Sequence, residues 1–155
     1  MDFAFSDEQD ELRASVRRFL EDKSPMGVVR RDMESPAGFD EALWKQATDE
    51  LGLAGIAIPE AYGGIGFGAI EQGIIMEELG RSLACMPFLS SVVMSGWLIL
   101  LAGTESARDE LLPGIASGER RVTIAAFESA SGFSIESIKT TVSGSSGRVT
   151  VSGGK

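Results

Sequence analysis

The chain has 155 residues, a length that suits one ordinary domain or one domain plus the start of another. Its hydrophobic fraction of 43% and charged fraction of 24% are typical of a soluble globular protein. Fourteen basic and 23 acidic side chains give a net charge of −9, which repels the phosphates of nucleic acids and anionic lipid surfaces. A nucleic acid is therefore not expected as a partner.

Cysteine and histidine usage narrows the class of protein further. A single cysteine, Cys85, provides no intrachain disulfide, and residues 1–3 do not begin a signal peptide, so we expect a cytoplasmic protein. The longest apolar run, residues 86–102, is interrupted by proline and serines and is shorter than the roughly 20 residues of a membrane span. Histidine is absent, which removes the usual general base and most zinc sites, so we expect no metal site.

The first 52 residues carry the pattern of three helices. Ser6 and Gln9 have the spacing of a capping box, and apolar residues then recur on one helical face, which predicts a helix over residues 7–21. A weaker pattern predicts a short helix over 26–33. Asp40 can cap a third helix, and Gly52 is its natural end.

The next stretch contains a glycine-rich loop followed by more helices. Residues 53–58 are predicted to be extended, and glycines at 63–68 predict a tight loop. Helical spacing then predicts a helix that ends at Gly80 and a buried helix over 88–101. A last helix begins after Thr104, and Leu111, Leu112 and Pro113 are expected to close it.

After Gly118 the hydrophobic period changes from helix to strand. Residues 122–127 are predicted to form a strand, and residues 138–142 and 148–151 to form a hairpin around a four-residue loop. We therefore predict a helical domain over 1–118 and the incomplete beginning of a β domain over 119–155.

Few side chains suggest chemistry by themselves. The acidic clusters at 7–11 and 77–78 are expected to be solvated helix faces, and Cys85 a packed thiol. Trp44 and Trp97 are candidates for the core. The glycines near residue 64 lack the spacing and the βαβ frame of a dinucleotide fingerprint. The sequence therefore predicts no catalytic residue.

An ordered set of short motifs nevertheless resembles the acyl-CoA dehydrogenase family across nearly the whole chain. Each motif is modest alone, but their order is specific. The motifs are Phe5 to Phe19, Trp44 with Leu51-Gly52, Ile58-Pro59-Glu60-Ala61-Tyr62-Gly63-Gly64, Glu77-Glu78-Leu79-Gly80-Arg81, Gly103-Thr104-Glu105 and Leu112 to Glu119.

The resemblance implies a mainly α fold, with the family's amino-terminal helical bundle followed by the first strands of its β-barrel domain. It also implies FAD as the cofactor and an acyl-CoA thioester as the substrate. In the family a glutamate of a carboxy-terminal domain removes the α-proton, and the β-carbon passes hydride to the flavin. No residue here matches that base, so this chain is expected to be inactive alone. The implied partners are an electron-transferring flavoprotein and further family subunits, in a homo- or hetero-oligomer that serves fatty acid or lipid metabolism.

The resemblance also implies particular site residues. The family's flavin loop corresponds to residues 127–134, in which Glu128 matches the family but two phenyl rings replace two hydroxyl side chains. The residues implied to bind the cofactor are Ala126, Phe127, Gly132 and Phe133, and those implied to bind the substrate are Ser90, Met94 and Ser134. Core packing is the more ordinary role for both Ser90 and Met94.

Two functions remain open from the sequence. One is an FAD-dependent acyl-CoA dehydrogenase, of which this chain is the amino-terminal part. The other is a partner subunit that has lost its own flavin site and supports an active subunit, because the rings of Phe127 and Phe133 occupy the positions of hydroxyl donors.

Overall fold

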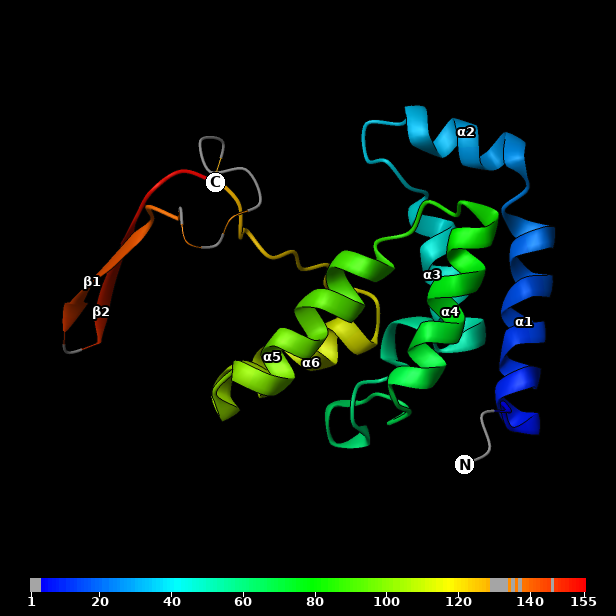
Figure 1. Cartoon of the computed structure of the whole chain (residues 1–155), viewed down its shortest axis with the longest axis horizontal. Helices are drawn as coiled ribbons and strands as arrows, with labels where there is room; N and C mark the ends of the chain where they lie inside the picture. The colour runs from blue at the N-terminus through cyan, green and yellow to red at the C-terminus, as the bar shows by residue number, and fades with distance from the viewer. Residues whose placement is uncertain (1–3, 129–133, 135, 137, 146) are drawn as a thin grey trace. The chain divides into compact units, whose positions relative to one another are not determined.

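The computed structural model of the chain describes residues 4–128, 134, 136, 138–145 and 147–155. It consists of two compact units, Met1–Thr123 and Ile124–Lys155, and each is described by itself. The first unit is helical and the second contains an antiparallel strand pair (Figure 1). The fold is thus mainly α, as predicted. The proposed domain limits of 1–118 and 119–155 stay a prediction.

The first three helices follow their local capping signals. Helix α1 (Asp7–Lys23) begins with the predicted capping box, and it continues two residues past the predicted end. Helix α2 is Met26–Glu34, and α3 is Glu41–Leu51. The Asp40 carboxylate accepts hydrogen bonds from the first free N–H groups of α3, and Gly52 ends the helix in the left-handed region with φ of 65°.

The prediction of an extended segment over 53–58 is wrong. Two 3₁₀ turns, Leu53–Gly55 and Glu60–Tyr62, fold the chain back, and the glycine loop donates backbone hydrogen bonds to the carbonyls of Gly55, Ile56 and Ile58. These isoleucines are buried, so tertiary packing rather than strand pairing explains their apolar character. Only glycine fits at position 64, because a Cβ there would lie 1.9 Å from the carbonyl oxygen of Ile58.

Three further helices complete the helical unit, and two of their ends differ from prediction. Helix α4 (Ala69–Ser82) runs past Gly80 and ends at Leu83, which takes the left-handed conformation itself. Helix α6 (Glu105–Ala116) starts at the Thr104 cap as predicted but contains Pro113. The proline does not close the helix, because the residues after it continue the helical hydrogen bonds at Ser117 and Gly118.

The predicted buried helix is a π-helical segment, η3 (Phe88–Ser95), continued by α5 (Gly96–Ala102). Only part of its surface is buried. Phe88 and Val92 belong to the core, whereas Leu101 is 76% exposed. Three other apolar side chains of this segment are also exposed, namely Leu89, Met94 and Leu98. The prediction that the whole segment is buried is therefore wrong for one of its faces.

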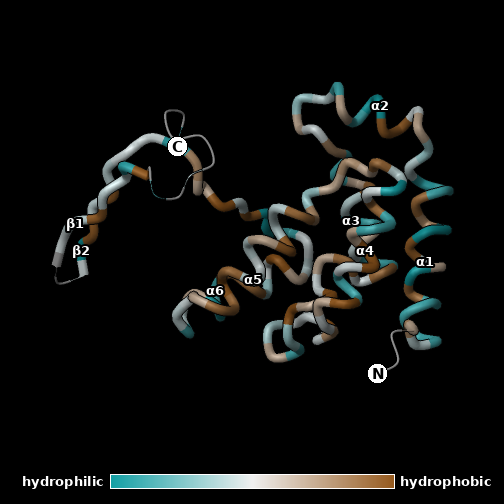
Figure 2. The backbone as a smooth tube through the Cα atoms, in the orientation of Figure 1, coloured by the Kyte–Doolittle hydropathy of each residue, from teal (hydrophilic) through white to brown (hydrophobic). Residues whose placement is uncertain are grey.

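One hydrophobic core holds the helical unit together. It contains the predicted apolar face of α1, including Val16 and Leu20, together with Trp44 of α3 and Ile75 of α4. Helix α1 packs beside both α4 and α3, and the hydrophobic residues of these helices recur between hydrophilic ones (Figure 2). Trp97, the second core candidate, packs at the edge of this core and is only half-buried.

The second unit contains strands β1 (Thr141–Ser145) and β2 (Arg148–Ser152). They pair as a hairpin, but the pairing extends to Ser145 opposite Arg148, so the connection is shorter than the predicted four residues. Residues 122–127 form no paired strand in the part of the chain that the structure describes. No helix among the described residues is long and apolar enough to cross a membrane.

Candidate functional site

A pocket of about 470 Å³ opens on the helical unit where the chain leaves it. Three segments surround the pocket: the α2–α3 connection, the α4–η3 connection with the start of η3, and residues 121–123. Most of the lining is apolar. Its residues are Ala37, Gly38, Phe39, Ala84, Cys85, Met86, Pro87, Ser90, Arg121, Val122 and Thr123. We call it the Ser90 pocket.

Arg121 is the only charged residue of that lining. Its guanidinium group donates a hydrogen bond of 2.6 Å to the Glu41 carboxylate, and it lies over the Phe39 ring, 5.2 Å from the ring centre. These two contacts hold a long, flexible side chain that is 38% exposed. The sequence reasoning did not select Arg121, because its partner Glu41 lies 80 positions earlier in the chain.

Two buried serines of η3 anchor the wall of the Ser90 pocket at Val122. The Ser91 hydroxyl accepts a hydrogen bond of 3.1 Å from the Val122 N–H. The Ser95 hydroxyl lies 2.7 Å from the Ser90 carbonyl oxygen and 3.2 Å from that of Val122. The backbone that leaves the helical unit is thereby fixed at both of its polar groups. Sequence reasoning treated these serines only as small residues.

The predicted substrate residues lie in different surroundings. Ser90 lines the pocket, and its hydroxyl donates to the Pro87 carbonyl oxygen at 3.4 Å. Met94 is 46% exposed and is not part of the pocket lining. Ser134 belongs to the second unit and is exposed. The structure thus brings only Ser90 to this pocket, and the substrate roles of all three residues remain predictions.

Cys85 behaves as the packed thiol that was predicted. It is half-buried in the wall of the Ser90 pocket, and its Sγ donates to the Val29 carbonyl oxygen at 3.8 Å. Burial, with a smaller contribution from the Asp32 carboxylate, raises the pKa of this thiol. The thiol is therefore protonated at neutral pH and is a poor nucleophile.

The predicted flavin segment belongs to the second unit. Phe127 is 46% exposed, and Ala126 is half-buried with its carbonyl oxygen 3.3 Å from the Lys155 amino group. Gly132 and Phe133 lie outside the described residues. The side chain of Phe127 has no hydrogen-bond donor, so only backbone groups at this position can bind a polar ligand.

Glu128 fixes the start of this segment. Its carboxylate accepts hydrogen bonds from the backbone N–H groups of Lys139 and Thr140 and from the Thr140 hydroxyl, at 2.6–2.9 Å. Lys155 adds an ion pair at 3.1 Å. These donors, the Thr140 hydroxyl above all, lower the pKa of Glu128 to about 2. The carboxylate thus joins residue 128 to residues 139 and 140 within the second unit.

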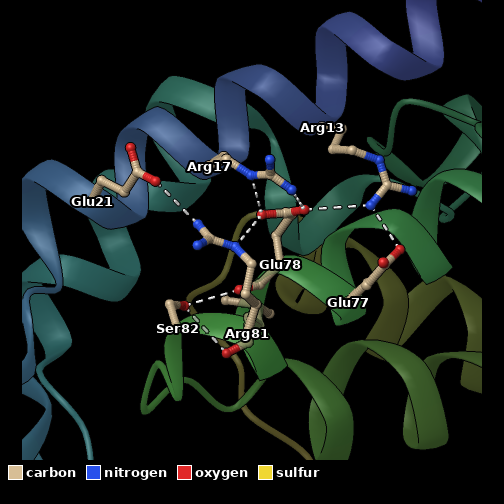
Figure 3. Close-up of polar contacts among 8 residues, drawn as sticks. Arg13, Arg17, Glu21, Glu77, Glu78, Arg81 and Ser82 are labelled. Carbon is tan, nitrogen blue, oxygen red and sulfur yellow. Dashed lines mark hydrogen bonds and ion pairs between the residues drawn. The ribbon is translucent and has the colours of Figure 1, made fainter.

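A second polar cluster joins α1 to α4. Glu78 has a fully buried carboxylate that lies between Arg17 and Arg81 (Figure 3). Arg17 donates two hydrogen bonds to it, at 2.6 and 2.9 Å, while Arg81 and Arg13 approach to 3.0 and 3.3 Å. Hydrogen bonding from Arg17 is the largest cause that lowers the pKa of Glu78 to about 2.

This cluster corrects the prediction that residues 77–78 form a solvated face. Glu77 is 65% exposed, but Glu78 is not exposed at all. The predicted solvation holds for the acidic residues at the start of α1, which are exposed. The sequence does contain one signal for this cluster. Arg13 and Arg17 are four residues apart, so they project from the same face of α1. The cluster links α1 to α4 and so stabilises the bundle.

No group of three or more potential metal ligands occurs among the described residues.

Comparison with known proteins assigns the family. The sequence-family model described as acyl-CoA dehydrogenase, N-terminal domain matches residues 6–119 of this chain. The chain therefore belongs to the acyl-CoA dehydrogenase family, and the predicted resemblance is confirmed.

Particular relatives support this assignment. "Acyl-CoA dehydrogenase IpdE2" of Mycolicibacterium smegmatis is 33% identical over 113 residues, which are 73% of this chain and 36% of the relative. The solved ChsE4-ChsE5 complex from Mycobacterium tuberculosis matches with a TM-score of 0.84 and 25% identity, over 99% of this chain and 40% of that one. An acyl-CoA dehydrogenase complexed with FAD from Bacillus anthracis gives a TM-score of 0.77 at 27% identity, over 89% of this chain and 24% of that one. The chain thus spans well under half the length of these relatives.

Proposed function

We propose that this chain forms the amino-terminal part of a flavoprotein that oxidises the Cα–Cβ bond of an acyl-CoA thioester with FAD as the hydride acceptor. Family membership supports the reaction class, and the relative from Bacillus anthracis is described as complexed with FAD. The observation that carries the proposal is the Ser90 pocket. Most of its lining residues are apolar, and its volume of about 470 Å³ lies within the usual size range of small-molecule sites, as do those of three other pockets on the helical unit.

In this proposal the helical unit binds the acyl group and excludes water from it. The apolar wall at Met86 and Pro87 contacts the acyl chain, and the Ser90 hydroxyl offers a polar contact. Dehydrogenation needs such a site. An acyl group whose Cα–Cβ bond is already held in position and shielded from water loses less conformational freedom on reaching the transition state than one free in water. The general base is expected from another part of the protein, and no residue of this chain is assigned that role.

FAD fits the described part of the flavin segment only through the backbone. When bound it would supply the hydride acceptor of the reaction. Around it, Ala126 would offer its backbone N–H group, and the exposed Phe127 ring an apolar surface. Glu128 would hold the segment in place without exposing its charge to the phosphates, because its carboxylate is occupied by Lys139, Thr140 and Lys155.

The test is a flavin spectrum and an activity assay on one sample. The polypeptide that carries this sequence is purified from its native cells, its intact mass is measured, and its absorbance is recorded between 350 and 500 nm. We expect the yellow absorbance of bound FAD, and its bleaching when an oxidisable acyl-CoA is added. Bound FAD that no acyl-CoA in a broad panel bleaches would contradict the dehydrogenase assignment.

A second candidate function is that of a partner subunit without its own flavin. The observation that favours it is Phe127, whose exposed ring replaces a hydroxyl donor of the family's flavin loop. A heteromeric relative exists, since one matching structure is described as the ChsE4-ChsE5 complex. Under this alternative the purified polypeptide is colourless alone and yellow only with a second family subunit. An electron-transferring flavoprotein would accept the electrons under either function.

A further inference from the structure

We propose that the Ser90 pocket binds the far end of an acyl group that carries a carboxylate, and that Arg121 recognises this carboxylate. The inference rests on the proposed function, because it takes the pocket as the acyl site. It adds the chemical class of the acyl group, a dicarboxylic acid monothioester, and a specificity residue that the family resemblance did not select.

The charge of the pocket favours an anionic ligand. Arg121 is its one formally charged lining residue, in a chain of net charge −9, and the same side chain also lines a neighbouring pocket together with Glu41. The overall field repels anions, so an anionic ligand needs a local cation. A guanidinium group matches a carboxylate well, because its planar donors can form parallel hydrogen bonds to both carboxylate oxygens.

Arg121 is already held in place yet keeps donors available. Glu41 accepts from one terminal nitrogen, and the Phe39 ring supports one face of the guanidinium. The other two nitrogens have no hydrogen-bond partner among the described residues. A side chain oriented in this way loses less conformational entropy on binding than a free arginine. Phe39 also lines the pocket, so this support belongs to the pocket wall.

The position of Glu41 opposes an anionic ligand. Its carboxylate is mostly exposed and competes with a ligand carboxylate for the same guanidinium group. Removal of the Glu41 charge should therefore strengthen binding of an anionic acyl group, while removal of the Arg121 charge should abolish the preference. A surface ion pair without a ligand role predicts neither result.

The experiment compares two probes of equal chain length on the 155-residue chain. The probes are the N-acetylcysteamine thioesters of adipic acid, whose far end is a carboxylate, and of hexanoic acid, whose far end is a methyl group. Methionine methyl groups labelled with ¹³C report binding by NMR. Met86 lines the Ser90 pocket and also a neighbouring pocket that contains Met33 and Met76, so a shift of Met86 without a shift of Met33 or Met76 reports the Ser90 pocket. Met26 lines neither pocket. We expect the adipyl thioester to bind about fivefold more tightly than the hexanoyl thioester, as a partly exposed charged hydrogen bond would give.

The wild type and three variants make the test specific. In Arg121→Met the adipyl preference should disappear while hexanoyl binding stays the same. In Glu41→Gln the preference should increase by about twofold to fivefold. Arg120→Met is the matched control, because it makes the same charge change at a neighbouring residue outside the pocket lining, and it should leave the wild-type preference unchanged. The Met26 signal checks that each variant is folded.

Different failures have different meanings. If both thioesters shift Met86 equally in the wild type, or if Arg121→Met keeps the preference, the carboxylate inference is wrong and the acyl site stands. If neither thioester shifts Met86, the proposed acyl site fails and the inference fails with it. If Arg120→Met loses as much of the adipyl preference as Arg121→Met, the preference comes from long-range charge attraction. That result would also overturn recognition by Arg121.

Discussion

Glu78 in the helical unit and Glu128 in the second unit are both carboxylates with a pKa lowered to about 2, but they reach that value by different means. Glu78 is surrounded by guanidinium groups from two helices. Glu128 accepts hydrogen bonds mainly from backbone N–H groups and a hydroxyl. The first carboxylate joins two helices, and the second joins residue 128 to the backbone of residues 139 and 140.

The comparison teaches that a low pKa by itself does not reveal what a carboxylate does. A buried charge among arginines supports the packing of the bundle, and its loss is felt throughout the unit. A carboxylate that binds backbone groups sets a local conformation, and its loss is felt in the loop. The following variants separate these two effects.

The largest effect is expected for Glu78→Ala. This change leaves the arginines around a fully buried position without their anion, and it should lower the free energy of unfolding by about 3–5 kcal/mol. Urea denaturation followed by circular dichroism at 222 nm measures it. Glu77→Ala is the matched control, because Glu77 is adjacent and 65% exposed, and it should cost less than about 1 kcal/mol. Equal losses in the two variants would refute the special role of Glu78.

Acid should remove the same stabilisation gradually. The pKa of Glu78 falls from 4.5 to about 2 on folding, so the ionised carboxylate stabilises the fold above pH 4.5, and this contribution disappears as the pH falls toward 2. The shift corresponds to about 3 kcal/mol. Denaturant titrations between pH 6 and 2 should show a steeper loss in the wild type than in Glu78→Gln. Parallel curves for the two proteins would contradict the lowered pKa.

A smaller change, of opposite sign, is expected from Gly73→Ala. Gly73 lies within α4, the same helix as Glu78, and an added Cβ there meets no atom within 4 Å. Alanine should raise the free energy of unfolding by about 0.5–1 kcal/mol through its helix propensity. The same gain in a Glu78→Ala background would show that helix propensity and the ion cluster act independently. Gly64→Ala is the contrasting variant and should destabilise, because its Cβ would meet the Ile58 carbonyl.

Glu128→Ala should have the smallest effect on global unfolding. Its hydrogen bonds lie within the second unit, so the denaturation midpoint of the helical unit should stay the same. Faster amide hydrogen exchange at Lys139 and Thr140, whose N–H groups lose their acceptor, is the expected local result. Glu128→Gln keeps one acceptor oxygen and should show a smaller increase. Unchanged exchange at both amides would mean that the carboxylate does not fix the loop.

Local signals predicted much of the helical unit. The caps at Ser6, Asp40 and Thr104 and the stop at Gly52 were correct, because each depends on hydrogen bonds between residues that are close in the chain. The ordered motifs also led to the family. For the candidate site, sequence reasoning selected Ser90, which lines the pocket, but it missed Arg121.

The errors share one cause, which is distance along the chain. The isoleucines of residues 53–58 looked like a strand because burial and strand pairing give the same short apolar run. Glu78 looked solvated because its partners on α1 are more than 60 positions away.

Helix positions, their caps and the family followed from order and spacing in the chain, since the physical interactions behind them span only a few residues. The apolar Ser90 pocket, its single cation and the buried anion of α4 arose only when distant segments packed together. Their chemistry depends on burial and on partners from other elements, and neither can be seen along a single stretch of chain.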